Sequence, residues 1–179
     1  MGGFSFYDWV LHAASVEQVE LRPLGDTNAP GDRQAMSASA RAMLHWCSIV
    51  ERLTRDKHAR GARIYAGFEK LSRVRPVLRR YRQLASVAER LVVFGERDEA
   101  IELDAEQIDV TDSPLSREWF LVVHCADYGA LLAAKDLTGF GPTGPLPGRR
   151  FAAVTAKDRV FIERAAHRLV AHIEELRKQ

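Results

Sequence analysis

The sequence has little that would support redox or metal chemistry. Its 179 residues contain two cysteines, Cys47 and Cys125, which lie far apart and without the spacing of a metal motif. The six histidines include no H-x-x-x-H or H-E-x-x-H pattern, and His167 and His172, five residues apart, are a poor helical pair for a metal. We therefore predict free thiols in preference to a disulfide, no metal site and no cofactor.

Long apolar runs and a leader sequence are missing too. No stretch approaches the ~18 apolar residues of a membrane helix, and the start, MGGFSF, has neither a basic leader nor a cleavage pattern. Phe6 stands where a myristoylation motif needs Ser or Thr. The hydrophobic fraction of 46% and the charged fraction of 28% are typical of a soluble globular chain. We predict one cytoplasmic domain over residues 1–179, without membrane contact.

The stretch over residues 118–137 organises the predicted fold. Its first half is apolar on both sides of an extended chain, with Trp119, Leu121 and Val123 on one side and Phe120 and Val122 on the other. Such a strand must be covered on both faces, so it belongs inside a sheet. Turn-prone residues 124–129 separate it from the apolar run 130–134, which predicts two neighbouring strands with a tight connection.

Hydrophobic periodicity places the remaining elements around this pair. Helices are expected over residues 6–14, 35–55, 76–90 and from about 158 to the end. Strands are expected over residues 16–21, 63–68 and 91–95, near 108, and over 150–155. Residues 23–32 and 138–148 are rich in Gly and Pro and predict loops. Because strands often follow one another directly, we predict an α+β fold, a mainly antiparallel sheet of five or six strands with packed helices, similar to GAF and PAS sensory domains.

Capped amphipathic helices are expected near both ends of the chain. Ser5 precedes the first, and Thr155 with Asp158 forms a capping box before the last. The apolar stripe of the first helix packs either on the domain's own core or on a second copy of the chain. We expect a homodimer contact made by these helices.

Arginine is concentrated in one segment. Residues 73–90 carry six arginines against Glu89 alone, and residues 96–118 then carry nine acidic and two basic residues. The arginines are Arg73, Arg75, Arg79, Arg80, Arg82 and Arg90. One interpretation is a solvated helix face that answers the acidic segment; the other is a site for a phosphate, a nucleotide or another anion. No helix-turn-helix, zinc-finger or RNP pattern accompanies them, so direct DNA binding is not expected.

Two motifs suggest chemistry that their context does not support. His124 and Cys125 adjoin at a strand end, but neighbouring residues of a strand point to opposite faces, so the pair would not form a nucleophile and base. Gly139, Gly141 and Gly144 fit G-x-G-x-x-G, but prolines follow and no helix begins, as a dinucleotide site requires. We predict no catalytic residues.

Ligand-binding residues are expected among aromatic side chains that face the predicted core, since a small sensor can keep a cavity there. The basic helix and the end of the central strand add polar candidates. The predicted set is Trp46, Tyr65, Arg80, Tyr81, Trp119 and His124.

Several short segments also follow one another in a recognisable order. They are RRYRQLA (79–85), VVFG (92–95), EWFLVV (118–123), LLAAKDL (131–137) and RRF (149–151), followed by the Thr155 and Asp158 pair. This order resembles the DICT family, the sensory domain named for diguanylate cyclases and two-component systems. The resemblance implies a non-catalytic input domain in bacterial signal transduction, found beside GGDEF, EAL, histidine-kinase or DNA-binding modules, with a proposed link to light responses. It provides no ligand-binding residues.

The favoured hypothesis is a sensory or regulatory domain that binds a small molecule, an anion or a partner protein and acts on a signalling output domain. Two alternatives stay open. One is a small enzyme that uses His124, Cys125 or the arginines on an anionic substrate. The other is a protein-interaction scaffold without a ligand.

Overall fold

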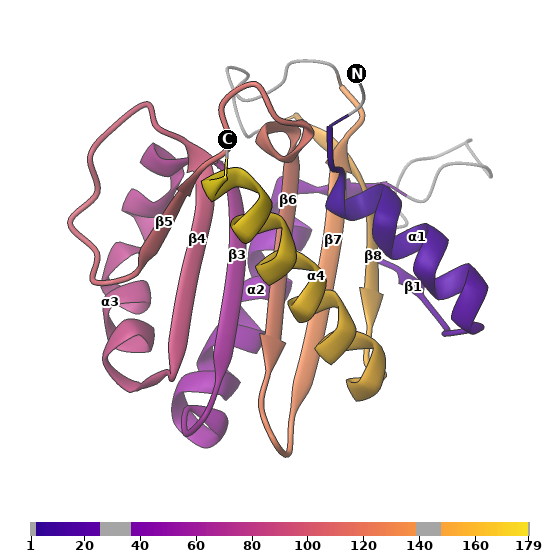
Figure 1. Ribbon diagram of the computed structural model, residues 1–179, viewed down its shortest axis with the longest axis horizontal. Coiled ribbons are helices and arrows are strands. Elements are labelled where there is room, and N and C mark those ends of the chain that lie inside the picture. Colours follow the sequence, from indigo (N-terminus) through magenta and orange to yellow (C-terminus); the bar gives the residue numbers. More distant parts are fainter. Residues whose placement is uncertain (1–2, 26–36, 139–147, 179) are drawn as a thin grey trace.

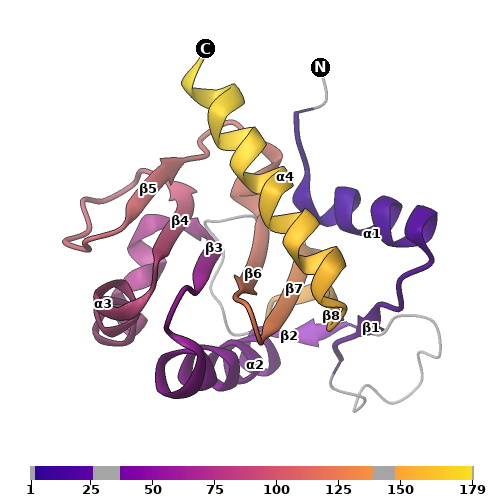
Figure 2. The same ribbon diagram turned by 60° about the horizontal axis from the view of Figure 1, so that its bottom comes forward.

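The structure is a computed structural model, which describes residues 3–25, 37–138 and 148–178. In this part of the chain, four α-helices lie on the two faces of one sheet (Figure 1). They are α1 (Phe6–Glu17), α2 (Ala40–Leu53), α3 (Leu78–Val87) and α4 (Arg159–Arg177). Figure 2 shows α1 and α4 on one side of the sheet and α2 and α3 on the other, so the fold has three layers.

Eight strands form the sheet among the described residues. They are β1 (Arg22–Pro23), β2 (Ala38–Ser39), β3 (Arg63–Lys70), β4 (Arg90–Glu96), β5 (Glu106–Asp109), β6 (Glu118–His124), β7 (Gly129–Asp136) and β8 (Arg150–Ala156). Their order is β1-β8-β7-β6-β3-β4-β5, and β2 also pairs with β8. The β3–β4 and β4–β5 pairs are parallel and the other five are antiparallel. This confirms the predicted α+β fold with a mainly antiparallel sheet; the likeness to GAF and PAS domains stays a prediction.

Strand β6 lies in the middle of the sheet, as its doubly apolar pattern predicts. It pairs antiparallel with β7 on one side and with β3 on the other. Trp119, Leu121 and Val123 are buried under α2 and α3, and Phe120 and Val122 are buried under α1 and α4. Burial of each large apolar side chain contributes roughly 1.5 to 3 kcal/mol, so β6 stabilises both cores at once.

The two terminal helices pack on the domain's own sheet. The hydroxyl of Ser5 accepts an amide hydrogen bond from the first turn of α1, which confirms the predicted cap. Phe6 and Val10 are fully buried, and the ring of Trp9 stacks on Phe161 of α4 with centroids 6.0 Å apart. Of the two interpretations of the α1 stripe, the structure therefore shows the one in which it covers the chain's own core.

The opposite layer is built from α2, α3 and two shorter helical turns. A π-helical turn, η1 (Thr54–His58), extends α2, and a 3-10 helix, η2 (Leu71–Val77), leads from β3 into α3. Ser39 caps α2 by accepting the amide of Ala42 at 3.1 Å. Cys47 on α2 and Cys125 after β6 are both free and buried.

Residues 16–21 were predicted as an edge strand, and this is wrong. The first of these residues complete α1, because Gln18 adopts a left-handed φ of 56° and its N–H donates to carbonyls of the last helical turn. The edge strand is β1, which has two residues only. Only Val16 and Glu17 of the weak apolar alternation belong to α1, and residues 18–21 connect its end to β1 without regular structure.

Three further details differ from the sequence-based expectation. The carboxylate of Asp158, without Thr155, caps α4 by accepting the amide of Phe161 at 2.9 Å. Strand β3 was expected to be half-buried, but Tyr65 on its second face is buried under α1 and α4. The helix expected from residue 76 begins as η2, and α3 ends at Val87 because the next residue is extended.

Some predictions fall outside the described residues. Most of the two Gly- and Pro-rich loops and the G-x-G-x-x-G motif lie within residues 26–36 and 139–147. Among the described helices, none is long and apolar enough to cross a membrane.

Candidate functional site

A small apolar pit opens between α2 and η2, over the end of β3 and the start of β6. Its volume is about 80 Å³. Phe68 of β3 and Trp119 of β6 form its floor, since side chains of neighbouring strands at this register point to the same face. Leu44 of α2 and Val77 of η2 form its walls. The pit is lined almost entirely by apolar side chains, with Arg73 as its one charged neighbour among the described residues.

A wider basic groove adjoins the pit along the seam between α2 and α3. Its volume is about 470 Å³, and Pro76 and Val77 line both spaces. The groove is lined further by Ser48, Arg52, Arg55, Arg79, Arg80 and Gln83. None of these described lining residues is acidic, so the groove presents concentrated positive charge beside an apolar pit.

A buried carboxylate holds one of these arginines in place. Glu51 of α2 is 3% exposed and accepts hydrogen bonds from Arg80 Nε and, at 2.8 Å, from the hydroxyl of Tyr81. Burial raises the pKa of Glu51, while the charge of Arg80 and both hydrogen bonds oppose that rise. Burial also raises the pKa of Tyr81, and the nearby Glu51 adds to this effect. This buried network fixes the guanidinium of Arg80 at the floor of the groove, at little further entropic cost when a ligand arrives.

The six clustered arginines divide between the two interpretations. Three form ion pairs with the acidic segment 96–118: Arg75 with Glu99, Arg82 with Glu102, and Arg90 with Glu106. Two turn inward instead, where Arg73 pairs with Glu69 and Arg80 with Glu51. The solvated-face interpretation therefore holds for half of them.

Arg79 belongs to neither group. It is exposed, lines the groove, and makes no ion pair or hydrogen bond with any residue in the described part of the chain. Its guanidinium is thus available to an anion without breaking an internal contact. Arg52 and Arg55 are also at the rim, but Arg52 donates to Ser48 of its own helix and Arg55 to Asp56 and Gln83.

The structure brings three of the six predicted ligand residues together. Arg80, Tyr81 and Trp119 all line a small crevice that shares lining residues with both the pit and the groove. Trp46 is half-buried on α2 and does not line the pit or the groove. Tyr65 lies on the opposite face of the sheet, with Arg90 over its ring at 5.9 Å. His124 lies at the far end of β6, where it pairs with Arg63 and Gly129.

Sequence reasoning missed most of the residues that shape this seam. Leu44, Phe68 and Val77 were assigned to core packing or were not singled out, because an apolar residue at helical or strand spacing is normally buried. Arg52 and Arg55, three residues apart on one helix face, gave a local signal of a basic rim that could have been used. Their proximity to Arg79 depends on how α2 and α3 pack.

Comparison with protein-family models supports the resemblance seen in the sequence. The model described as "Sensory domain in DIguanylate Cyclases and Two-component system" matches residues 20–137. That range contains the whole pit and groove and four of the five similar segments; residues 149–151 and the Thr155 and Asp158 pair lie beyond it. Comparisons with curated proteins and with solved structures gave no match. With two thirds of its length matched, the chain belongs to the DICT family of sensory domains.

Proposed function

We propose that this domain is a non-catalytic input module of bacterial signal transduction that binds a small amphipathic anion in the seam between α2 and α3. The apolar part of the ligand would lie on Trp119 in the pit, and its anionic group would meet Arg79 and Arg80 in the groove. The observation that carries this proposal is that an apolar pit adjoins a groove lined by arginines, with Pro76 and Val77 lining both and no carboxylate among the described lining residues of either. On this proposal the domain works in the cytoplasm and acts on an output domain or a partner protein.

The site suits a sensor because a ligand there contacts separately connected elements. The walls belong to α2 on one side and to η2 and α3 on the other, while the floor belongs to the sheet. A ligand that binds one arrangement of these elements more tightly shifts the population toward that arrangement. Families of sensory domains need such a shift, whereas an enzyme needs reactive groups in contact with the ligand. No described lining residue of the pit or groove is an exposed nucleophile beside a base.

Binding of anilinonaphthalene sulfonate, an aromatic sulfonate, tests the proposal with a probe of matched chemistry. We expect one molecule to bind per chain, with enhanced probe fluorescence. Changing Arg79→Ala should weaken binding by about 5-fold, the equivalent of losing an exposed ion pair of about 1 kcal/mol. Changing Leu44→Trp should remove most binding, because the larger side chain fills the pit from an exposed position.

Arg75→Ala is the matched control for this test. Arg75 is also exposed and lies on η2, but it pairs with Glu99 and does not line the groove. If Arg75→Ala weakens the probe as much as Arg79→Ala does, binding follows overall charge and the groove proposal is wrong. Native mass spectrometry of protein purified from its source cells provides the second readout. A chain that carries no small molecule and does not bind the probe would be better explained as an interaction scaffold.

Self-association through the terminal helices is part of the same proposal. Since the apolar stripes of α1 and α4 are buried against the sheet, the contact would use their outer faces, where Val16 and Val160 are exposed. Light scattering during size-exclusion chromatography should show the mass rising toward that of a dimer as concentration increases. A mass that stays monomeric at high concentration would remove this mechanism and leave the ligand proposal intact.

A further inference from the structure

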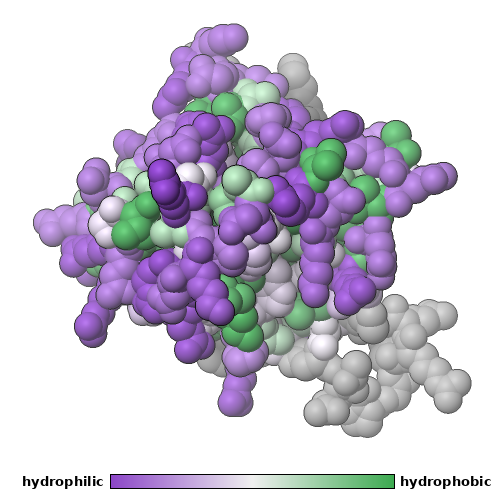
Figure 3. Space-filling model, turned by 90° about the horizontal axis from the view of Figure 1, so that it is seen from below, coloured by the Kyte–Doolittle hydropathy of each residue, from purple (hydrophilic) through white to green (hydrophobic). Residues whose placement is uncertain are grey.

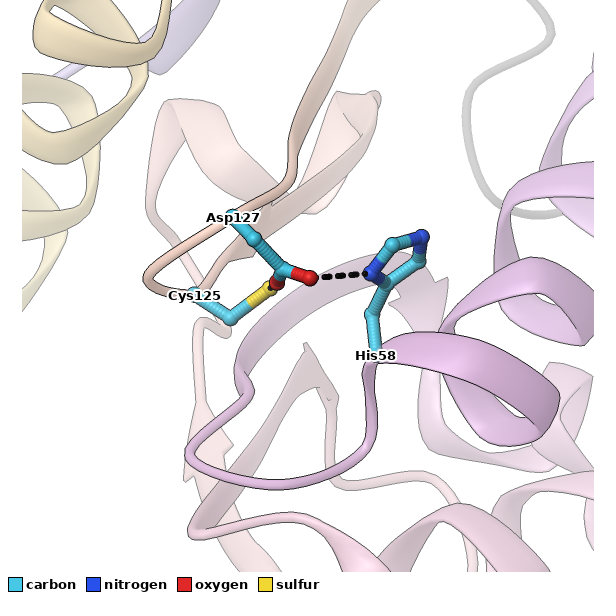
Figure 4. Close-up of side chains that lie close together, drawn as sticks. All are labelled: His58, Cys125 and Asp127. Carbon is cyan, nitrogen blue, oxygen red and sulfur yellow. Dashed lines mark hydrogen bonds and ion pairs between the residues drawn. The ribbon is translucent and has the colours of Figure 1, made fainter.

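His58, Cys125 and Asp127 converge at the opposite end of the sheet from the pit (Figure 4). Nδ1 of His58 lies 3.2 Å from Oδ2 of Asp127, and Sγ of Cys125 lies 3.4 Å from Oδ1 of the same carboxylate. One ligand atom from each residue falls within 4.8 Å of the others. An imidazole, a thiol and a carboxylate thus point toward one another from segments that are 67 residues apart in sequence, from 58 to 125.

Contacts with neighbouring elements position the segments that carry these side chains. His58 ends the π-helical turn η1, a rare conformation that often occurs at functional sites. Its ring stacks on Tyr128 with centroids 4.5 Å apart and planes 9° apart, which fixes the ring orientation. Cys125 and Asp127 lie in the tight turn between β6 and β7, which Arg159 of α4 fastens by donating to the carbonyl of Ala126.

We propose that His58, Cys125 and Asp127 form a binding site for a borderline-soft divalent cation such as Zn²⁺. In a tetrahedral zinc site, bond lengths of about 2.0 to 2.3 Å place ligand atoms about 3.3 to 3.8 Å apart. The separations of 3.4 and 3.2 Å, each to a different oxygen of Asp127, are close to that spacing. With all three ligand atoms within 4.8 Å of one another, a small side-chain adjustment would bring them around one ion. The mixed nitrogen, sulfur and oxygen set favours zinc over magnesium or calcium, which take oxygen ligands.

The cluster is buried at one side and exposed to solvent at the other. Cys125 is 2% exposed, whereas the side chain of Asp127 is 71% exposed. A cation would enter past Asp127 and bind the thiolate at the inner end, with the thiol proton released to solvent. Three protein ligands leave one position for water or for an incoming ligand. Figure 3, which views this end of the molecule, shows a mostly hydrophilic surface with small scattered apolar patches, as access by a hydrated ion requires.

The bound cation would join the end of α2 to the β6–β7 turn. That contact is separate from the α2–α3 seam, so the inference does not depend on the proposed ligand site. The position of the three residues in the sequence explains why no metal motif was found there. Known zinc motifs place their ligands close together in sequence, whereas the pairing of β3 with β6 brings His58 close to Cys125. His124, the histidine next to Cys125, is not part of the cluster.

Metal titration of the full chain tests the site, with Zn²⁺ for affinity and Co²⁺ as the spectroscopic probe. We expect one ion per chain and a thiolate-to-cobalt charge-transfer band in the ultraviolet. Changing His58→Ala or Asp127→Asn, both solvent-accessible, should weaken Zn²⁺ binding by about 10- to 100-fold, and Cys125→Ser by about 100-fold or more. Free Zn²⁺ at about 100 times Kd should raise Tm by about 5 to 10 °C.

His124→Ala is the matched control and should leave affinity and the cobalt band unchanged. Should Cys125→Ser fail to fold, the two accessible variants and the cobalt band still decide the question. The proposal is overturned if the wild-type chain binds Zn²⁺ no more tightly than about 1 mM. It is equally overturned if cobalt binds without a thiolate band, or if His58→Ala binds Zn²⁺ as the wild type does.

Discussion

Changing Arg149→Met should lower the free energy of unfolding by about 3 to 5 kcal/mol, because it breaks a buried ion pair from one side only. Arg149 is 1% exposed, and it donates from Nη1 and Nη2 to the two carboxylate oxygens of Glu69 at 2.9 and 2.6 Å. Nη2 also lies 2.9 Å from Asp136 Oδ2. The guanidinium packs over the ring of Phe151 at 4.8 Å. Removing it leaves buried carboxylate charge that water cannot reach.

The size of this effect depends on what remains around Glu69. Its pKa is raised by burial, and Arg149 and Arg73 together oppose that rise. Arg73 pairs with Glu69 at 2.6 Å, and because this contact does not involve Arg149, we expect a loss nearer the lower end of the range. Glu69 also has a left-handed φ of 66°, which costs about 1 kcal/mol or more for a residue other than Gly. The buried pair holds that conformation in place.

Urea unfolding of Arg149→Met beside Arg63→Met measures the effect. Nε and Nη2 of Arg63 both donate to Oε1 of Glu89, but both side chains are about half exposed. The control should therefore change stability by about 0 to 1 kcal/mol. If both variants lose the same unfolding free energy, burial of the Arg149–Glu69 pair does not increase the cost of breaking it, and the prediction is wrong.

Local sequence patterns predicted where the helices and strands lie better than they predicted which strands pair with one another. The continuous apolar run in residues 119–123 placed β6 inside the sheet, because a strand that is apolar on both faces must be covered on both. The same reasoning identified β4 from its short apolar run. It could not show that β4 pairs parallel with β3 and β5, since the pairing partner is set by how η2 and α3 cross over the sheet.

The candidate site shows the same limit more sharply. Arg79 and Arg80 are adjacent in the sequence, yet one faces an open groove and the other binds a buried carboxylate 29 residues away. Composition predicted a basic segment opposite an acidic one, and three arginines do pair in that way. Which arginine is left for a ligand is decided by Glu51, whose burial between α2 and α3 has no signature in the local sequence.

A single buried carboxylate should make stability depend on pH near neutrality. Glu118 is 1% exposed beneath the start of α1, where it accepts hydrogen bonds from the Ser5 hydroxyl at 2.5 Å and the Tyr7 amide at 2.9 Å. Burial raises its pKa from 4.5 to about 7, and the nearby Asp8 adds to the rise, while the two hydrogen bonds oppose it. Between these values the folded chain keeps a proton that the unfolded chain releases. The stability from this proton is therefore complete below pH 4.5 and is lost as pH rises through 7.

The loss should reach about 3 kcal/mol, since each pKa unit corresponds to about 1.4 kcal/mol. Chemical unfolding at several pH values between 4.5 and 8 measures it, with Glu118→Gln as the reference, because the amide does not titrate. Its oxygen can accept from the Tyr7 amide, and its NH₂ group can donate to the Ser5 hydroxyl oxygen. Relative to Glu118→Gln, the wild type should lose unfolding free energy as pH rises. The difference between the two proteins should level off above pH 7. Asp8→Asn should move that shift to lower pH, because one neighbouring negative charge is gone. A difference that stays constant across the range would mean that Glu118 is ionised throughout, with the helix N-terminus outweighing the cost of burial.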